Sequence, residues 1–241
     1  MELIPSIDLR GGRVVRLAQG DYARETVYDA DPVEQARRFA AAGVARIHVV
    51  DLDAARDGGE GNASIVAAIL AAVPATRVQV GGGMRSKARV GRALDAGAER
   101  VVIGTAALEE PGLLREIAHL HPRRIVLGLD TKGGKVATRG WREVSARTPA
   151  DVLAELGDLP LGALLYTEIG RDGLLQGPDV EGTAALARTT SIPVLASGGV
   201  GKLDDLVRLA ETRVIAGAIV GRALYAGAIQ LEEALARLAS C

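Results

Sequence analysis

The sequence has few of the residues that mark several large classes of protein. Its 241 residues include one cysteine, one tryptophan and one phenylalanine. A single cysteine cannot form an internal disulfide, which is typical of proteins from reducing compartments. Aromatic residues make up 2% of the chain, too few for the base-stacking surfaces of single-strand binders. The 29 Lys and Arg residues balance 30 Asp and Glu residues, so no net field favours nucleic acid.

Long apolar runs and metal-ligand clusters are also missing. No run approaches the roughly 18 residues needed to span a bilayer, and the acidic start Met1-Glu2-Leu3 does not resemble a signal peptide. The three histidines and Cys241 show no metal-ligand spacing with carboxylates. We therefore expect a soluble, cytoplasmic monomer that uses no metal or cofactor and binds neither nucleic acid nor membrane.

Short β-branched runs alternate with Ala- and Leu-rich segments of helical period. Near-continuous apolarity in these runs indicates strands buried on both faces, as in parallel sheets. The predicted strands are 3–7, 46–50, 77–80, 100–103, 124–129, 163–166, 193–196 and 214–220. The predicted helices are 32–42, 64–72, 87–96, 112–120, 150–156, 180–188, 203–210 and 231–239. This α/β pattern fits a (β/α)8 TIM barrel better than a doubly wound open sheet, which usually has fewer strands.

The sequence also repeats itself in order. Residues 7–14 (IDLRGGRV) are echoed by residues 129–136 (LDTKGGKV), and Gly82-Gly83 by Gly198-Gly199. Ile103-Gly104-Thr105-Ala106 is echoed by Val220-Gly221-Arg222-Ala223. The repeat predicts one domain, 1–241, built from two duplicated (β/α)4 halves near 1–121 and 122–241.

Glycine-rich turns follow the third, fourth, seventh and eighth predicted strands. Glycine lets backbone N–H groups approach an anion closely, and a following helix adds a favourable dipole. One such turn is more often only a tight connection, whereas two symmetric pairs favour phosphate binding. Opposed phosphate sites predict a small-molecule substrate phosphorylated at both ends. The residues assigned to phosphate binding are Gly82, Gly83, Gly104, Thr105, Ser197, Gly198, Gly199, Gly221 and Arg222.

Two carboxylates end opposite strands of the predicted barrel. Asp8 closes the first strand and Asp130 the fifth, so both lie at the mouth where barrel enzymes work. Such a pair is suited to moving a proton off one atom and onto another, although each Asp can instead cap the Gly-Gly turn that follows it. Asp51 and Thr167 close the second and sixth strands. Asp51 is a candidate for substrate binding or for holding a loop, and His48 is expected to be packed in the second strand.

Trp141 lies in a glycine-rich, charged loop directly after Asp130. A lone tryptophan over the mouth is suited to stacking on a flat ring of the substrate. The alternative is that Trp141 only packs against the rim of the barrel.

Four motifs carry a resemblance that covers essentially the whole chain: residues 4–9 (IPSIDL), 15–22 (VRLAQGDY), 81–86 (GGGMRS) and 167–173 (TEIGRDG). They are similar to the phosphoribosylformimino-AICAR-phosphate isomerases of histidine biosynthesis, which are metal-free (β/α)8 barrels. The resemblance implies an Amadori rearrangement of an aminoaldose phosphate to its ketose form. It implies Asp8 as general base at sugar C2, Asp130 as general acid, Thr167 as support for the pair, and Gly20 and Trp141 in substrate binding.

Two related families remain as alternatives. Arg139 before Gly140-Trp141 resembles the dual-substrate actinobacterial isomerase, which also acts on phosphoribosylanthranilate in tryptophan biosynthesis. There Arg139 would bind the anthranilate carboxylate, whereas residues 19–22 resemble the single-substrate enzyme. The other family is the cyclase subunit of imidazole glycerol phosphate synthase, which usually has Cys where Ser6 stands. A non-catalytic phosphate-binding barrel is the last alternative, and it leaves Asp8 and Asp130 without a purpose.

Overall fold

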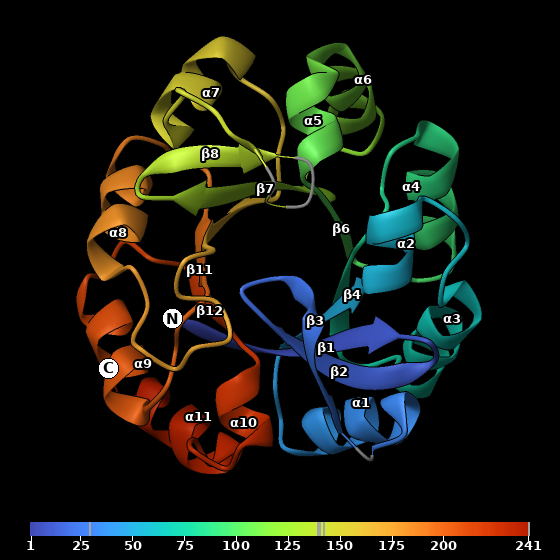
Figure 1. The fold of residues 1–241 in the computed structure, drawn as a ribbon, viewed down its shortest axis with the longest axis vertical. Helices are drawn as coiled ribbons and strands as arrows, with labels where there is room; N and C mark the ends of the chain where they lie inside the picture. The colour runs from blue at the N-terminus through green and yellow to red at the C-terminus, as the bar shows by residue number, and fades with distance from the viewer. Residues whose placement is uncertain (29, 139–140, 142, 241) are drawn as a thin grey trace.

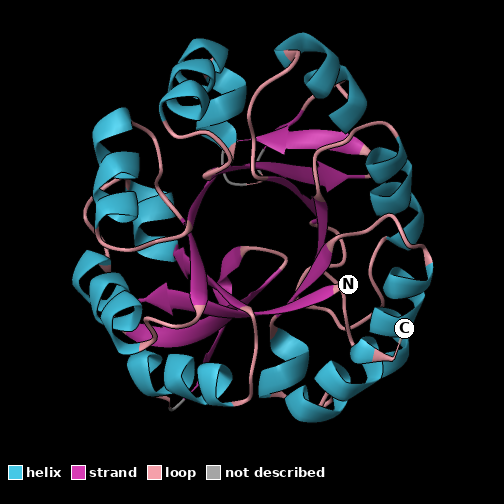
Figure 2. Ribbon diagram, turned by 180° about the vertical axis from the view of Figure 1, so that it is seen from behind, coloured by secondary structure: helices cyan, strands magenta, loops and turns pink. Residues whose placement is uncertain are grey.

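A closed parallel barrel forms the centre of the computed structural model, which describes residues 1–28, 30–138, 141 and 143–240. Its strands follow the order β1-β4-β5-β6-β7-β10-β11-β12, and β12 pairs with β1 to close the ring. Helices surround the barrel (Figure 1), and the view from behind shows the strands as a ring (Figure 2). The strands are β1 (Glu2–Arg10), β4 (Arg46–Asp51), β5 (Arg77–Gly81), β6 (Arg100–Ile103), β7 (Ile125–Lys132), β10 (Ala163–Glu168), β11 (Val194–Ser197) and β12 (Gly217–Val220). The prediction of a (β/α)8 barrel is confirmed.

The predicted helices are confirmed to within one or two residues at their ends. They are α1 (Pro32–Ala41), α3 (Ala63–Ala72), α4 (Lys87–Asp95), α6 (Pro111–Leu120), α7 (Pro149–Leu156), α8 (Val180–Arg188), α9 (Leu203–Glu211) and α11 (Leu231–Ala239). Several begin at residues that satisfy free backbone N–H groups: Asp31 caps α1, Ser86 caps α4, and Thr148 forms a capping box with Asp151 at α7. Among the helices of the described residues, none is long and apolar enough to cross a membrane.

Two hairpins extend the barrel at its mouth, and the sequence did not predict them. β1 and β7 continue past Asp8 and Asp130, so the expectation that these aspartates end their strands was wrong. Both strands fold back through two-residue glycine turns whose positive φ angles match a tight hairpin. The hairpins lie on opposite sides of the mouth (Figure 1). The added elements are β2 (Arg13–Ala18), β3 (Asp21–Tyr28), β8 (Lys135–Thr138), β9 (Glu143–Val144), α2 (Leu52–Asp57), α5 (Thr105–Glu109) and α10 (Arg222–Tyr225).

The core is almost entirely aliphatic, as the composition predicted. Ile4, Leu165, Leu195 and Ile219 belong to one cluster of buried residues, and a larger cluster joins the barrel strands to the surrounding helices. Polar side chains also occur inside the barrel. Adjacent strands place Ser6, His48, Gln79 and Arg100 in register, and all are buried.

Candidate active site

Asp8 lies on β1 near the mouth and is held by two neighbours. The Ser6 hydroxyl donates to Asp8 Oδ1 at 2.9 Å, and the Arg16 guanidinium forms an ion pair with Oδ2. Arg16 comes from β2, the strand that the Gly11-Gly12 turn folds back along β1. It also donates to the Ser6 carbonyl and lies over the Tyr225 ring, 5.2 Å from its centroid. A permanent cation therefore faces Asp8 in a buried setting.

Asp130 lies on β7, next in register to Thr167 of β10. The Trp141 indole Nε1 donates to Asp130 Oδ2 at 2.8 Å, and the Thr167 side chain is a second hydrogen-bond partner. Burial raises the pKa of Asp130, and these two hydrogen bonds only partly oppose the shift. Asp130 thus binds a proton more readily than an ordinary aspartate, which suits a general acid.

A third carboxyl at the mouth, Asp172, was missed in the sequence reasoning. It follows β10, and burial raises its pKa to about 7, with the charges of Asp8 and Asp130 acting in the same direction and Arg16 opposing. Asp172 therefore lies within electrostatic range of both predicted catalytic aspartates. Its signal was present in the motif of residues 167–173, directly after a barrel strand, where mouth residues are expected.

Three loops meet over the mouth. Gln19, in the turn between β2 and β3, donates its backbone N–H to the Asp172 carbonyl and its side-chain amide to the Gly170 carbonyl, both at 3.0 Å. Gly20 has a φ of +69°, and a Cβ there would overlap the Trp141 ring. Trp141 is thus placed at the mouth, between Gly20 and Asp130. Arg139 lies outside the described residues.

The glycine turns assigned to phosphate binding follow β5, β6, β11 and β12. A Cβ at Gly82 would overlap the Asp51 carbonyl, and one at Gly199 would overlap the Gly177 carbonyl. In both predicted halves a glycine therefore allows this turn to pack closely against the backbone at the carboxyl end of the preceding barrel strand or in the loop that follows it. The remaining assigned residues, Gly83, Gly104, Thr105, Ser197, Gly198, Gly221 and Arg222, lie in the same four turns.

Two of these turns lead into short helices without a side-chain cap. Gly104 precedes α5 and Gly221 precedes α10, and neither helix start has a side-chain cap hydrogen bond. Arg222 donates to the Gly173 carbonyl, which ties α10 to the loop that carries Asp172. The two turns thus leave the first backbone N–H groups of α5 and α10 without a side-chain acceptor.

Asp51 is occupied by its own loop. Oδ1 accepts from the Ala54 N–H at 3.0 Å and the Asn62 side-chain amide at 2.8 Å, and Oδ2 accepts from the Asn62 N–H at 2.8 Å. Both carboxylate oxygens therefore brace the segment between β4 and α3. Of the two roles considered for Asp51, this geometry favours holding the loop.

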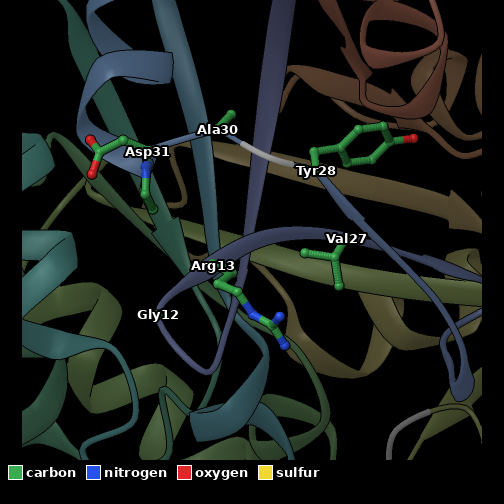
Figure 3. A pocket seen from close by; sticks show the side chains of 7 residues that line it. Gly12, Arg13, Val27, Tyr28, Ala30 and Asp31 are labelled. Carbon is green, nitrogen blue, oxygen red and sulfur yellow. The ribbon is translucent and has the colours of Figure 1, made fainter.

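Neither a metal centre nor the surface hollow beside α1 offers a rival site. Within the described ranges, no group of three or more His, Cys, Asp or Glu side chains is placed to hold a metal ion. A hollow of about 370 Å³ lies between the β2–β3 hairpin and α1 (Figure 3). Its Asp31 carboxylate caps α1, and the Arg13 guanidinium points away from Asp31 (Figure 3). The carboxyls Asp8, Asp130 and Asp172 lie at the barrel mouth and not at this hollow.

A (β/α)8 barrel with carboxyl groups gathered at the carboxyl ends of its strands has the layout of a small-molecule barrel enzyme. The chain belongs to the histidine biosynthesis protein family, whose model matches residues 2–230.

Three relatives carry the name 1-(5-phosphoribosyl)-5-((5-phosphoribosylamino)methylideneamino)imidazole-4-carboxamide isomerase. The relative from Rhizorhabdus wittichii is 52% identical over 235 residues, which cover 97% of this chain and 96% of the relative. The one from Synechococcus elongatus is 49% identical over 242 residues, covering 100% and 94%. The one from Paracoccus denitrificans is 48% identical over 239 residues, covering 99% and 100%.

Proposed function

We propose that this protein is the histidine-biosynthesis isomerase that converts the phosphoribosylformimino-AICAR phosphate aminoaldose into its phosphoribulosyl form. The observation that carries the proposal is the asymmetric pair of carboxyls at the mouth. Asp8 is paired with a buried cation, whereas Asp130 has neutral hydrogen-bond donors around it. Near full-length identity to relatives of that name supports the same reaction.

The rearrangement needs an acid and a base on opposite sides of the sugar. Asp130, as the acid, protonates the ring oxygen while the bond from C1 to that oxygen breaks and an iminium forms between C1 and nitrogen. Asp8, as the base, then removes the proton from C2, and the C–H electron pair forms the enaminol double bond between C1 and C2. Loss of the enol proton and protonation at C1 give the ketose. Arg16 forms an ion pair with Asp8 and so holds the carboxylate in place for the second step.

Asp172 is a second candidate for the acid. Its pKa of about 7 lies closest to neutral pH, where a general acid is most effective. The alkaline limb of the kcat–pH profile separates the two: it disappears in Asp130→Asn if Asp130 is the acid, and in Asp172→Asn if Asp172 is.

The substrate would lie across the mouth with one phosphate at each pair of glycine turns. Trp141 and Gly20 would cover the substrate at the mouth, and Thr167 would support Asp130. Phosphoribosylanthranilate as a second substrate remains a prediction from the sequence, with Arg139 as its carboxylate partner.

The test is turnover of purified protein with the aminoaldose phosphate, followed as loss of substrate and appearance of the ketose. Asp8→Asn should lower kcat by about 100-fold to 10,000-fold, the usual contribution of one general base. Asp95→Asn, at the exposed end of α4, is the matched control and should leave kcat unchanged. Absence of wild-type turnover, or near-normal kcat in Asp8→Asn, would contradict the proposal. A parallel assay with phosphoribosylanthranilate tests the second substrate.

A further inference from the structure

A chain of polar side chains inside the barrel takes no part in the mechanism above. Arg100 Nη2 donates to Gln79 Oε1 at 3.0 Å, and Gln79 Nε2 lies 3.0 Å from His48 Nδ1. These residues come from the adjacent strands β6, β5 and β4, and Gln79 is fully buried. Hydrogen bonds in such a setting are costly to leave unmade, so their directions are well defined.

Arg100 determines the direction of every bond in this chain. A guanidinium has only donors, so it must face the oxygen of the Gln79 amide. The Gln79 NH2 group then faces His48 and can only donate, so His48 Nδ1 has to accept. An imidazole that accepts at Nδ1 carries its proton at Nε2. The chain therefore selects one neutral tautomer of His48.

Nε2 of His48 is the ring nitrogen left for a partner other than Gln79. The two ring nitrogens point in widely different directions, so Nε2 points away from Gln79 on β5; the strand on the other side of β4 is β1, where Ser6 is the register partner of His48. Asp8 and Arg16 both act electrostatically on His48. Among the described residues, the fully buried side-chain nitrogen and oxygen atoms that lack a hydrogen-bond partner are Arg16 Nε and Arg100 Nε. His48 Nε2 is not one of them.

His48 is also held neutral. Burial lowers its pKa to about 4, Arg16 and Arg100 act in the same direction, and Asp8 opposes them. A protonated ring would bring an Nδ1–H against the Gln79 NH2 group, so the hydrogen-bond chain disfavours the cation for a second reason. A neutral ring donates without placing another positive charge beside Arg16.

We propose that Arg100 and Gln79 are positioning residues that lock His48 as a neutral Nε2–H donor to the substrate oxygen on C2. That oxygen adjoins the carbon from which Asp8 removes a proton, and the hydrogen bond strengthens when loss of the enol proton places negative charge on the oxygen. A preorganised neutral donor stabilises this charge without transferring its proton. The inference rests on the proposed function, and it gives His48 a role beyond the packing expected from the sequence.

The tautomer is directly measurable because the chain has only three histidines. Nitrogen-15 NMR of histidine-labelled protein distinguishes a protonated from an unprotonated ring nitrogen. His119→Gln and His121→Gln, at the end of α6 and away from the mouth, assign the signals and should leave activity unchanged. We expect His48 of the wild type to show Nε2–H and a bare Nδ1 at neutral pH.

Gln79→Glu is the matched test of function. The new carboxylate has nearly the same size and still accepts from Arg100, but it also accepts from His48, so the ring should switch to Nδ1–H. Loss of the Nε2–H donor should lower kcat by about 100-fold, as for other preorganised donors, while KM changes much less. If Gln79 served only folding, the variant would lose stability but would not show a large fall in kcat with a nearly unchanged KM.

Two outcomes would overturn the inference. One is a wild-type His48 that is charged or carries its proton on Nδ1. This NMR measurement needs no variant, so it tests the inference even if Gln79→Glu does not fold. The other is a switched tautomer in Gln79→Glu with unchanged kcat. Absence of wild-type turnover would instead count against the proposed function, because the tautomer is read without substrate.

Discussion

The charges of single residues at the mouth depend on one another. Arg16 pairs directly with Asp8 and acts electrostatically on Asp172, and the charges of Asp8 and Asp130 also act on Asp172. Burial raises the pKa values of Asp130 and Asp172, and Arg16 opposes the shift at Asp172. The proposed division between base and acid rests on the direct ion pair of Arg16 with Asp8.

His48 makes stability depend on pH. Its pKa falls from the ordinary 6.5 to about 4 on folding. Below pH 6.5 the unfolded chain therefore binds a proton at His48 that the folded protein does not bind. This contribution is complete above pH 6.5 and is lost as the pH falls toward 4, by about 3 kcal/mol if the full shift is realised. Urea unfolding across this range should show a smaller acid loss for His48→Gln than for the wild type. Parallel curves would contradict the shift.

Asp172 has the opposite effect over nearly the same range. Its pKa rises from 3.8 to about 7 on folding, so its contribution is complete below 3.8 and is lost as the pH rises toward 7. Unfolding free energies of Asp172→Asn should therefore fall less than those of the wild type between these pH values. If the variant follows the wild-type pH dependence, the carboxyl titrates normally.

The sequence predicted some of these residues and not others for a physical reason. Asp8 and Asp130 precede Gly-Gly turns in a repeated motif, and their place depends only on the strand pattern. Arg16 and Gln79 act through contacts between strands, and such contacts depend on register and on hairpin folding. Asp172 lies in a loop whose path over the mouth no periodicity encodes.

At the scale of elements, the β2–β3 hairpin carries Arg16 beside Asp8 and Gly20 beside Trp141. The short helices α2, α5 and α10 were missed because four to six residues are too few to establish a helical period. The hairpin strands were missed because they form only where the Gly-Gly turns fold β2 and β8 back along β1 and β7. The longer helices were predicted, since each has an apolar face and most have a recognisable start. The mouth is therefore shaped mainly by the elements that sequence patterns reveal least.

Gly20→Ala tests the contact between the hairpin and Trp141. The added methyl overlaps the indole ring, so we expect Trp141 to leave Asp130 and kcat/KM to fall by about tenfold, the order of one lost hydrogen bond. Kinetics and the chemical shift of the single indole N–H measure the effect.

Gly11→Ala is the control for backbone strain. Gly11 also has a positive φ, +53°, but an added Cβ there meets no atom within 4 Å. It should destabilise the protein by about 1 kcal/mol and leave the indole signal in place. An equal loss of kcat/KM in both variants would show that strain, and not the Trp141 contact, is responsible.

At the scale of the whole molecule, chemistry and stability separate. The carboxyls proposed for catalysis lie at the mouth, whereas the largest aliphatic cluster joins the barrel strands to the surrounding helices. Each predicted half contributes one carboxylate strand followed by a hairpin, β1–β2 and β7–β8. This arrangement supports the duplication inferred from the sequence, which remains a prediction.

Two leucines of α6 test this separation. Leu114 is 0% exposed and Leu120 is 63% exposed. Leu114→Ala should lower the free energy of unfolding by about 2–5 kcal/mol, and Leu120→Ala by less than about 0.5 kcal/mol. Both should retain wild-type kcat and KM well below their melting temperatures. Equal stability losses would show that α6 does not dock as described.

The position of the single tryptophan makes the protein its own optical sensor. With no other indole in the chain, tryptophan fluorescence comes only from the mouth, where the excited ring lies against Asp130. The emission intensity of Trp141 would therefore change when that carboxyl is protonated or a ligand arrives. Changes elsewhere in the aliphatic barrel would leave the emission unchanged. Rapid-mixing fluorescence of the unmodified protein can thus time ligand arrival at Trp141 separately from the chemistry.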